Sequence, residues 1–433
     1  MISSSSSRRQ VSVHPETEQR VPLLAVSPIL WNLAVDAGMP SAYRTLTGLQ
    51  ANGFDVHVVL PTDGASRDYQ EDGLVLHTFG TPRFGLKGSF GPHRSPFLLE
   101  APSGYSGSIR WKAFVAGMCG NALRRGLQVA NEISPAIVYG IMPPGAIAAS
   151  AIGRRRRIPN VTRLFGTFLA PMATWQLLGN LWEVAAFKVP ADLVIVTDDG
   201  TFGDVVARRL RLPHKRFEFL MNGGDEAFLR PLASGPVPKE SFGLPARMPL
   251  ALCAHHLWPS HHCDALVDAV GNLRTQGVNL AAVLAGDGPE RERLRAQAAA
   301  RNVADRVVLV GDIPRARLRE LMEVADVVVS LDELSNLVNS VIEALAVGRP
   351  IVASRSGGTE RLLLDGENAV LITPTSVDEL TTALRLVVED KSFAERLRAR
   401  ARKTAAERIL SWDERMNREA RLLRSLVGRR AAA

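Results

Sequence analysis

Short, continuously apolar segments alternate with longer segments of helical periodicity along most of the chain. Continuous rather than alternating apolarity is typical of parallel strands that are buried on both faces. The strands expected in the first half are 21–26, 54–60, 74–79, 136–139, 161–164, 193–197 and 217–220. Those expected in the second half are 250–254, 281–284, 307–310, 327–330 and 351–353. Strands that alternate with helices form a parallel sheet with helices on both faces, so the sequence predicts an α/β protein.

The length of 433 residues exceeds one ordinary hydrophobic core and indicates more than one domain. A linker rich in Pro, Gly and Ser, residues 231–248, separates two alternating units. We expect a disordered leader over 1–20, doubly wound Rossmann-like domains over 21–232 and 233–410, and a C-terminal helix and tail over 411–433. Ligands of such sheets bind at the carboxyl ends of the strands, so the cleft between the domains is the expected site.

Composition narrows the functional classes. A hydrophobic content of 46% and a charged content of 22% are those of a soluble globular protein, and the three cysteines fit a reducing cytoplasm. The stretch 164–182 carries few charges, but its Gly, Pro, Gln and Asn residues favour a soluble helix over a bilayer span. The basic run 154–157 is most simply a solvated helix end, and contact with an anionic membrane surface is the minority interpretation. Nucleic-acid-binding motifs are absent.

The stretch 331–360 is expected to form a loop, a helix that opens near Ser340 and ends at Gly348, a strand and a Gly-Gly turn. A helix that starts beyond the carboxyl end of a parallel strand directs free N–H groups and its dipole at an anion. Glu343, in the first turn, would then reach a sugar hydroxyl beside a phosphate. Ser340 and Glu343 also fit a capping box, in which the glutamate only satisfies the helix start. This stretch alone leaves both interpretations open.

An earlier strand–loop–helix unit contains Gly38 but lacks the three-glycine dinucleotide fingerprint, so a nicotinamide cofactor is not expected. Gly38 marks either a close backbone approach or an ordinary turn.

Several ordered motifs of the second half carry a resemblance. They are Asn222-Gly-Gly-Asp225, Leu284-Ala-Gly-Asp-Gly-Pro-Glu290, the segment 305–311, the segment 335–345, Gly348-Arg-Pro-Ile-Val352 and Gly357-Gly358. With these motifs the chain resembles retaining glycosyltransferases of the family 4 type (glycosyl transferases group 1), which have the GT-B fold. The likeness extends over 21–426 and is strong over 221–374.

The resemblance implies a role for each matching position. Glu343 would bind the donor ribose, and it can also serve as a cap. Gly38 would approach the diphosphate, and the strand end from Gly311 to Ile313 would lie against the nucleobase. The loop amides at the diphosphate would be those of Leu337, Val338, Asn339 and Ser340.

The chain departs from the family at three places. Ser335 stands where a second glutamate often holds the donor sugar. His256 and His261 stand where an Arg and a Lys usually clamp the diphosphate. Phe165-Gly166-Thr167 lacks the histidine that often lies near the donor sugar. We expect His256 and His261 to act with Glu343 at the donor; the alternative is that they only hydrogen-bond within their loop.

The resemblance implies transfer of a sugar from a nucleoside diphosphate sugar to an acceptor hydroxyl by front-face substitution. No cofactor is expected beside the donor substrate. No metal is expected either, because Asp198-Asp199 is better explained as a cap than as a metal motif.

The acceptor, whether a sugar, a polyol, a lipid-linked group or a small molecule, is not encoded in any recognisable motif; the loop 80–108 is expected to shape its site. The competing interpretation is a catalytically silent relative that binds a nucleotide sugar or scaffolds a partner enzyme. An epimerase is less favoured.

Overall fold

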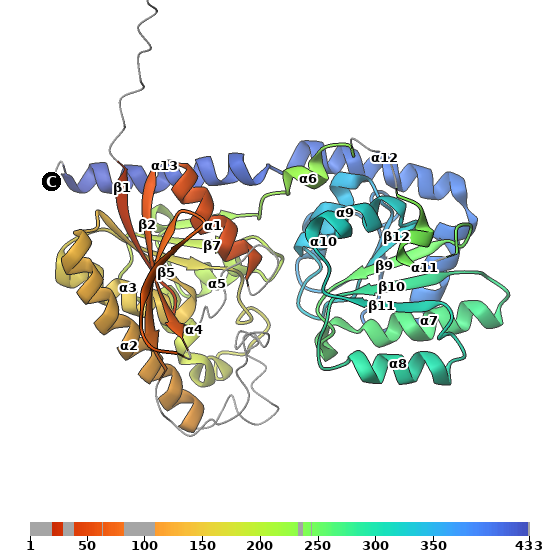
Figure 1. Ribbon diagram of the computed structural model, residues 1–433, viewed down its shortest axis with the longest axis horizontal. Coiled ribbons are helices and arrows are strands. Elements are labelled where there is room, and N and C mark those ends of the chain that lie inside the picture. The colour runs from red at the N-terminus through yellow and green to blue at the C-terminus, as the bar shows by residue number, and fades with distance from the viewer. Residues whose placement is uncertain are drawn as a thin grey trace, which may run out of the picture.

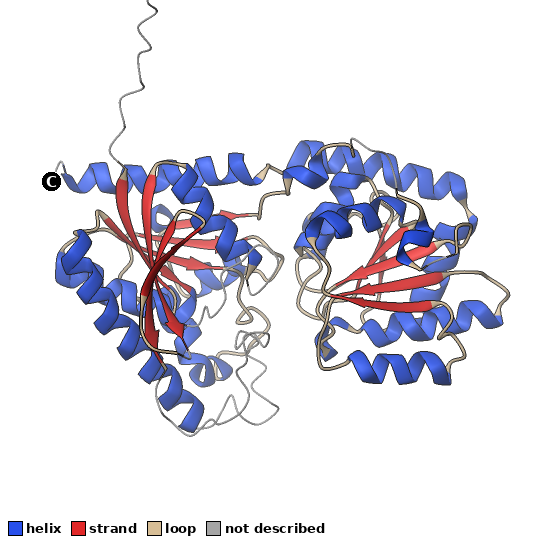
Figure 2. Ribbon diagram, viewed as in Figure 1, coloured by secondary structure: helices blue, strands red, loops and turns tan. Residues whose placement is uncertain are grey.

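The computed structural model describes residues 20–28, 39–62, 64–81, 109–232, 237–243 and 245–431. Within these ranges the strands form two separate sheets, each covered by helices on both faces (Figures 1 and 2). The predicted α/β architecture with two Rossmann-like sheets is confirmed. The leader up to residue 19, Gly38 and the loop segment 82–108 lie outside the described residues.

The first sheet has the strand order β3-β4-β2-β1-β5-β6-β7-β8. All its pairings are parallel except the one between β3 and β4. The antiparallel edge strand β3 was not anticipated; its side chains are mostly exposed, so it lacks an apolar signal. The strands are β1 (Val21–Val26), β2 (Phe54–Thr62), β3 (Asp68–Glu71), β4 (Leu74–Gly80), β5 (Ile137–Ile141), β6 (Asn160–Leu164), β7 (Leu193–Thr197) and β8 (Phe217–Leu220). The helices are α1 (Pro40–Ala51), α2 (Ile109–Ile133), α3 (Met142–Arg156), α4 (Leu181–Lys188) and α5 (Gly203–Arg209).

Two segments of the first half differ from expectation. Helix α3 was not assigned as a whole, although it has Pro in its first turn and three arginines in its last, as helix termini favour. The stretch 164–182 does not form the expected helix: it is mostly loop, with a 3₁₀ turn over Gln176–Asn180 before α4 starts. No helix in the described part of the chain combines the length and apolarity needed to cross a membrane.

The second sheet is parallel throughout, in the order β11-β10-β9-β12-β13-β14. The chain builds outward from β9 to β11 and then returns to the other side of β9 with β12. The switch point therefore lies between β9 and β12, where the carboxyl ends of such strands leave a crevice for ligands. The strands are β9 (Leu250–Ala254), β10 (Ala281–Ala285), β11 (Val307–Gly311), β12 (Val327–Ser330), β13 (Ile351–Ser354) and β14 (Val370–Ile372). The helices are α6 (Glu226–Leu229), α7 (Cys263–Thr275), α8 (Arg291–Ala300), α9 (Arg315–Val324), α10 (Asn339–Val347), α11 (Val377–Glu389) and α12 (Lys391–Arg408).

The helix α13 (Trp412–Ala431) returns to the first sheet, as Figure 1 shows along the upper edge of the molecule. Trp412, Met416, Ala420 and Leu423 belong to the same buried cluster as the apolar side chains of β1, β2 and β5. Glu419 of this helix is fully buried and accepts the hydroxyl of Tyr139. The last helix is therefore part of the first hydrophobic core.

Candidate functional site

Helix α10 starts at the switch point of the second sheet. Val338 is its N-cap residue, in an extended conformation, and no side chain caps the helix. The amides of Asn339 and Ser340 therefore have no acceptor within the helix. The capping-box alternative is wrong, because Ser340 lies inside the first turn and the carboxylate of Glu343 is bound elsewhere.

Glu343 is 3% exposed, and its carboxylate pairs with Arg315 of α9. Arg315 also donates to Asp225 at 3.0 Å, and Asp225 pairs with Arg44 of α1. Burial raises the pKa of Glu343, and the positive charge of Arg315 opposes that rise. A carboxylate has about four acceptor positions, so Glu343 can keep Arg315 and still accept a sugar hydroxyl.

Asn336 holds the loop that precedes α10. It is fully buried, and its Oδ1 accepts the hydroxyl of Ser330 at 2.7 Å and the N–H of Asp332 at 3.0 Å. Its Nδ2 donates to the carbonyl of Ser354 at 2.7 Å. This side chain thus ties the loop to the ends of β12 and β13. It was missed because its partners lie at positions that no local motif connects.

Ser335 occupies the position where the family often has a glutamate. Its side chain is 3% exposed, and its Oγ accepts the N–H of Leu337 at 3.2 Å. Leu337 is itself buried in the apolar core of the second sheet. In this conformation both residues shape the loop that precedes α10.

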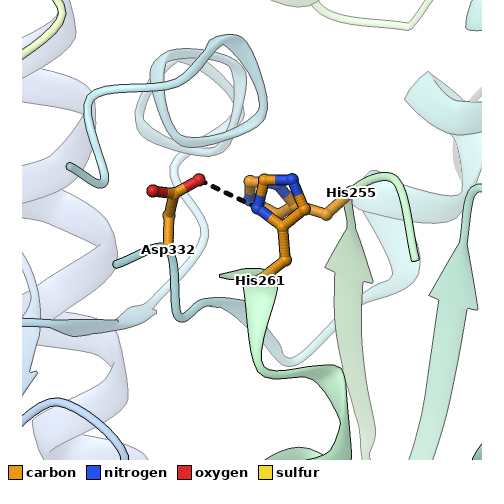
Figure 3. A group of neighbouring side chains, drawn as sticks. All are labelled: His255, His261 and Asp332. Carbon is orange, nitrogen blue, oxygen red and sulfur yellow. Dashed lines mark ion pairs between the residues drawn. The ribbon is translucent and has the colours of Figure 1, made fainter. Parts of the chain in front are cut away.

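The two histidines singled out from the sequence, His256 and His261, lie in different surroundings in the loop after β9. The rings of His255 and His261 lie 4.8 Å apart, centroid to centroid, and Nδ1 of His261 is 2.8 Å from Oδ2 of Asp332 (Figure 3). His256 is exposed and stands apart from this cluster. His255 and Asp332 were not singled out from the sequence. The adjacent histidines gave no local signal to distinguish them, and Asp332 lies on a different loop.

Gly311 and Ile313 lie where they were expected, at and just beyond the end of β11. Gly311 has a φ of +74° and its carbonyl accepts the N–H of Gly286 at 2.9 Å. Ile313 is partly buried against the core of the second sheet.

The first domain meets the start of α10 through α1. Nδ2 of Asn222 lies 3.2 Å from Oγ of Ser41 and donates to Oδ1 of Asn339 at 3.1 Å. The beginning of α1, which follows the Gly38 loop in sequence, is thus close to the free amides of α10.

The loop after β7 meets the Gly-Gly turn of the second domain. The N–H of Gly358 donates to the carbonyl of Gly200 at 2.6 Å. Next to it, burial raises the pKa of Asp199 to about 6, although Thr201 donates both its N–H and its hydroxyl to this carboxylate. Asp199 therefore caps a turn rather than the helix α5, whose N-cap is Phe202.

Comparison with known proteins identifies the family. The family described as Glycosyl transferases group 1 matches residues 238–404. The GDP-mannose-dependent alpha-(1-6)-phosphatidylinositol monomannoside mannosyltransferase of Mycolicibacterium smegmatis is 34% identical over 271 residues, 58% of this chain and 69% of that protein. The chain belongs to the group 1 glycosyltransferases.

The fold of this group 1 glycosyltransferase is also found in solved structures. Sucrose-phosphate synthase from Thermosynechococcus elongatus superimposes with a TM-score of 0.74 at 18% identity, covering 96% of this chain and all of that one. Anabaena HepE in complex with UDP-glucose gives a TM-score of 0.69 at 16% identity, covering 94% and 100%. The GT-B fold inferred from the motifs is thereby confirmed.

Proposed function

We propose that this glycosyltransferase moves a sugar from a nucleoside diphosphate sugar to an acceptor hydroxyl with retention of anomeric configuration, as in family 4. The free amides of Asn339 and Ser340, beside the carboxylate of Glu343 at the switch point of the second sheet, carry this proposal. Amides at a helix start favour a diphosphate, and the neighbouring carboxylate favours a ribose hydroxyl. The M. smegmatis relative is named as GDP-mannose-dependent, which supports a nucleotide donor.

In the proposed reaction the acceptor hydroxyl attacks the anomeric carbon on the face from which the diphosphate departs. A diphosphate oxygen takes the hydroxyl proton, so no protein base is needed. The enzyme contributes by aligning the two substrates and by stabilising charge on the leaving group. The second domain, 233–410, would hold the donor and the first, 21–232, the acceptor. Retention follows from the same-face geometry.

The cysteines support a cytoplasmic location for this reaction. Three cysteines in a chain of 433 residues are few, and such a low content fits a reducing compartment.

The test is a thermal-shift screen of sugar nucleotides, followed by turnover with candidate acceptors. A bound donor raises the melting temperature by mass action. The anomeric configuration of the product, read by NMR coupling constants, distinguishes retention from inversion. Donor binding without transfer or hydrolysis, across a broad acceptor panel, would support the catalytically silent alternative. No binding of any sugar nucleotide would contradict both.

A further inference from the structure

Two imidazoles and a carboxylate converge at the switch point of the second sheet. His255 directly follows β9, His261 ends the 3₁₀ turn Pro259–His261 after it, and Asp332 follows β12. One candidate ligand atom from each of the three lies within 4.8 Å of the others (Figure 3). The three side chains come from two loops, so their convergence is a product of the fold.

Hydrogen bonds fix the chemical state of His255. The hydroxyl of Ser330 donates its proton to Oδ1 of Asn336 at 2.7 Å, so it can only accept from Nε2 of His255, 3.0 Å away. Nε2 therefore carries the ring proton, and Nδ1 keeps a free lone pair. A ligating histidine usually donates its other ring N–H to a neighbouring acceptor, which fixes the tautomer and the orientation of the ring.

The two oxygens of Asp332 have different surroundings. Its Oδ1 accepts the N–H groups of Leu334 and Ser335, at 2.8 and 3.3 Å, which leaves Oδ2 beside His261.

The contact between Asp332 and His261 is close but poorly aligned. Nδ1 of His261 is 2.8 Å from Oδ2, yet this buried nitrogen has no well-directed hydrogen bond among the described residues. A hydrogen bond weakens steeply when the N–H points away from its acceptor. The nitrogen of His261 and the oxygen of Asp332 therefore lie close together without a well-aligned hydrogen bond, which fits two ligand atoms that share a metal ion.

The loop after β9 and the loop after β12 also contact each other beside the three side chains. The N–H of Glu333 donates to the carbonyl of Ser260 at 3.1 Å, and the carboxylate of Glu333 lies 3.0 Å from Nε2 of His262. The arrangement of the three side chains is therefore set before any ligand binds.

We propose that His255, His261 and Asp332 bind one divalent transition-metal ion, for which Zn²⁺ is the best match. Two imidazole nitrogens and one carboxylate oxygen are ligands that zinc accepts, whereas magnesium and calcium prefer oxygen ligands alone. Cys253 and Cys263 do not contribute, because both sulfur atoms are buried in the apolar core behind the loop. Three protein ligands leave a position on a four-coordinate ion open to water or to an incoming oxygen.

A metal ion bound by these three side chains departs from the expectation, drawn from the sequence, that no metal takes part.

The metal test needs no sugar nucleotide. The full chain is stripped with a chelator, and Zn²⁺ binding is measured by calorimetry and by metal analysis after gel filtration. One equivalent is expected for the wild type. His261→Gln and Asp332→Asn should each weaken binding by more than about tenfold, since loss of an outer partner alone often costs that much. His214→Asn is the control: it removes an exposed imidazole from the 3₁₀ turn His214–Arg216 of the first domain, so the zinc affinity should be unchanged.

Less than half an equivalent of Zn²⁺ on the wild type would overturn the proposal, as would equal affinity in the wild type and both ligand variants. Circular dichroism verifies that each variant is folded, and Co²⁺ provides a second readout through the visible spectrum of a nitrogen-ligated site. Repeating the sugar-nucleotide screen with and without Zn²⁺ separates the two proposals. Zinc binding without donor binding would leave the metal site standing and remove the proposed function; donor binding without zinc binding would do the reverse.

Discussion

The pair of Glu343 and Arg315 joins the proposed sugar contact to the stability of the fold. Glu343→Ala leaves the guanidinium of Arg315 with Asp225 as its remaining carboxylate. Breaking a buried ion pair costs about 3–5 kcal/mol, and the partner that remains should reduce this to about 2–4 kcal/mol in the free energy of unfolding. Donor affinity should fall by roughly ten- to a hundredfold.

Chemical denaturation and donor titration measure the two effects separately. Glu367→Ala is the control, because its pair with Arg400 is half exposed on both sides and should cost less than about 1 kcal/mol. A stability loss with unchanged donor affinity would make Glu343 purely structural.

Glu183 predicts an unusual pH dependence of stability. It is 6% exposed on α4, and burial raises its pKa from 4.5 to about 8. Between these values the folded state binds more protons than the unfolded state, so this group lowers stability as pH rises through the interval and has no further effect above it. The interval corresponds to at most about 5 kcal/mol.

Glu183→Gln should remove that loss. The variant should gain stability relative to the wild type between pH 5 and pH 9, as measured by urea unfolding across the range. Glu132→Gln, on the exposed face of α2, should follow the wild type throughout. Parallel curves for wild type and Glu183→Gln would show that the buried carboxyl does not titrate in this interval.

The sequence placed correctly those residues of the candidate site that belong to a local pattern. Glu343 and the amides of α10 followed from a helix start after a buried strand, and Gly311 followed from a strand end. Their partners were not accessible in this way. Arg315 is 28 positions from Glu343, Asp225 is 181 positions from Arg44, and Asp332 lies on a different loop from His261. Ion pairs at such separations depend on the sheet order, which no local spacing encodes.

Elements were predictable where packing imposes a strong pattern. Apart from β14, which was not predicted, the buried parallel strands carry continuous apolar segments and were assigned within a few residues. The edge strand β3 was missed because it buries little, and α3 because Pro143, Pro144 and Gly145 at its start resemble a turn when read without the sheet. The helix start of α10 was placed within one residue, but its capping could not be read from Ser340 and Glu343 alone.

Helix α13 carries a buried charge cluster where it packs on the first sheet. Glu419 pairs with Arg415 and accepts the hydroxyl of Tyr139, and Nε of the fully buried Arg163 lies 3.9 Å away. Burial would raise the pKa of Glu419, but the two arginines hold it below its usual range. Glu419→Gln leaves both guanidinium groups without a carboxylate and should cost about 3–5 kcal/mol of unfolding free energy.

Glu414→Gln is the control on the same helix. Its carboxylate accepts the N–H of Ser411 at 2.9 Å in a capping box, a role that Gln fulfils equally well, so the change should be small. Comparable stability of the two variants in denaturant would contradict the account of the buried cluster.

Arg361 of the second domain forms a contact with the first domain, in addition to the contact made by α13. It donates to Asp204 at 3.0 Å, lies 3.6 Å from Asp198, and covers the ring of Phe202 at 4.8 Å. Arg361→Ala should loosen this contact and raise hydrogen exchange of the amides in 198–204 by about tenfold, equivalent to about 1.4 kcal/mol.

Arg355→Ala is the control, because its partners Glu360 and Asp365 lie in its own domain. Equal exchange in both variants would show that the contact does not hold the domains together.

The return of α13 to the first sheet affects the order in which the protein can mature on the ribosome. The first domain is made first, but the apolar side chains that face Trp412, Met416, Ala420 and Leu423 stay uncovered until the whole second domain has been synthesised. The nascent chain must therefore carry an incomplete core through most of translation. The second domain can therefore finish folding first. The last helix to leave the ribosome, α13, then completes the first domain.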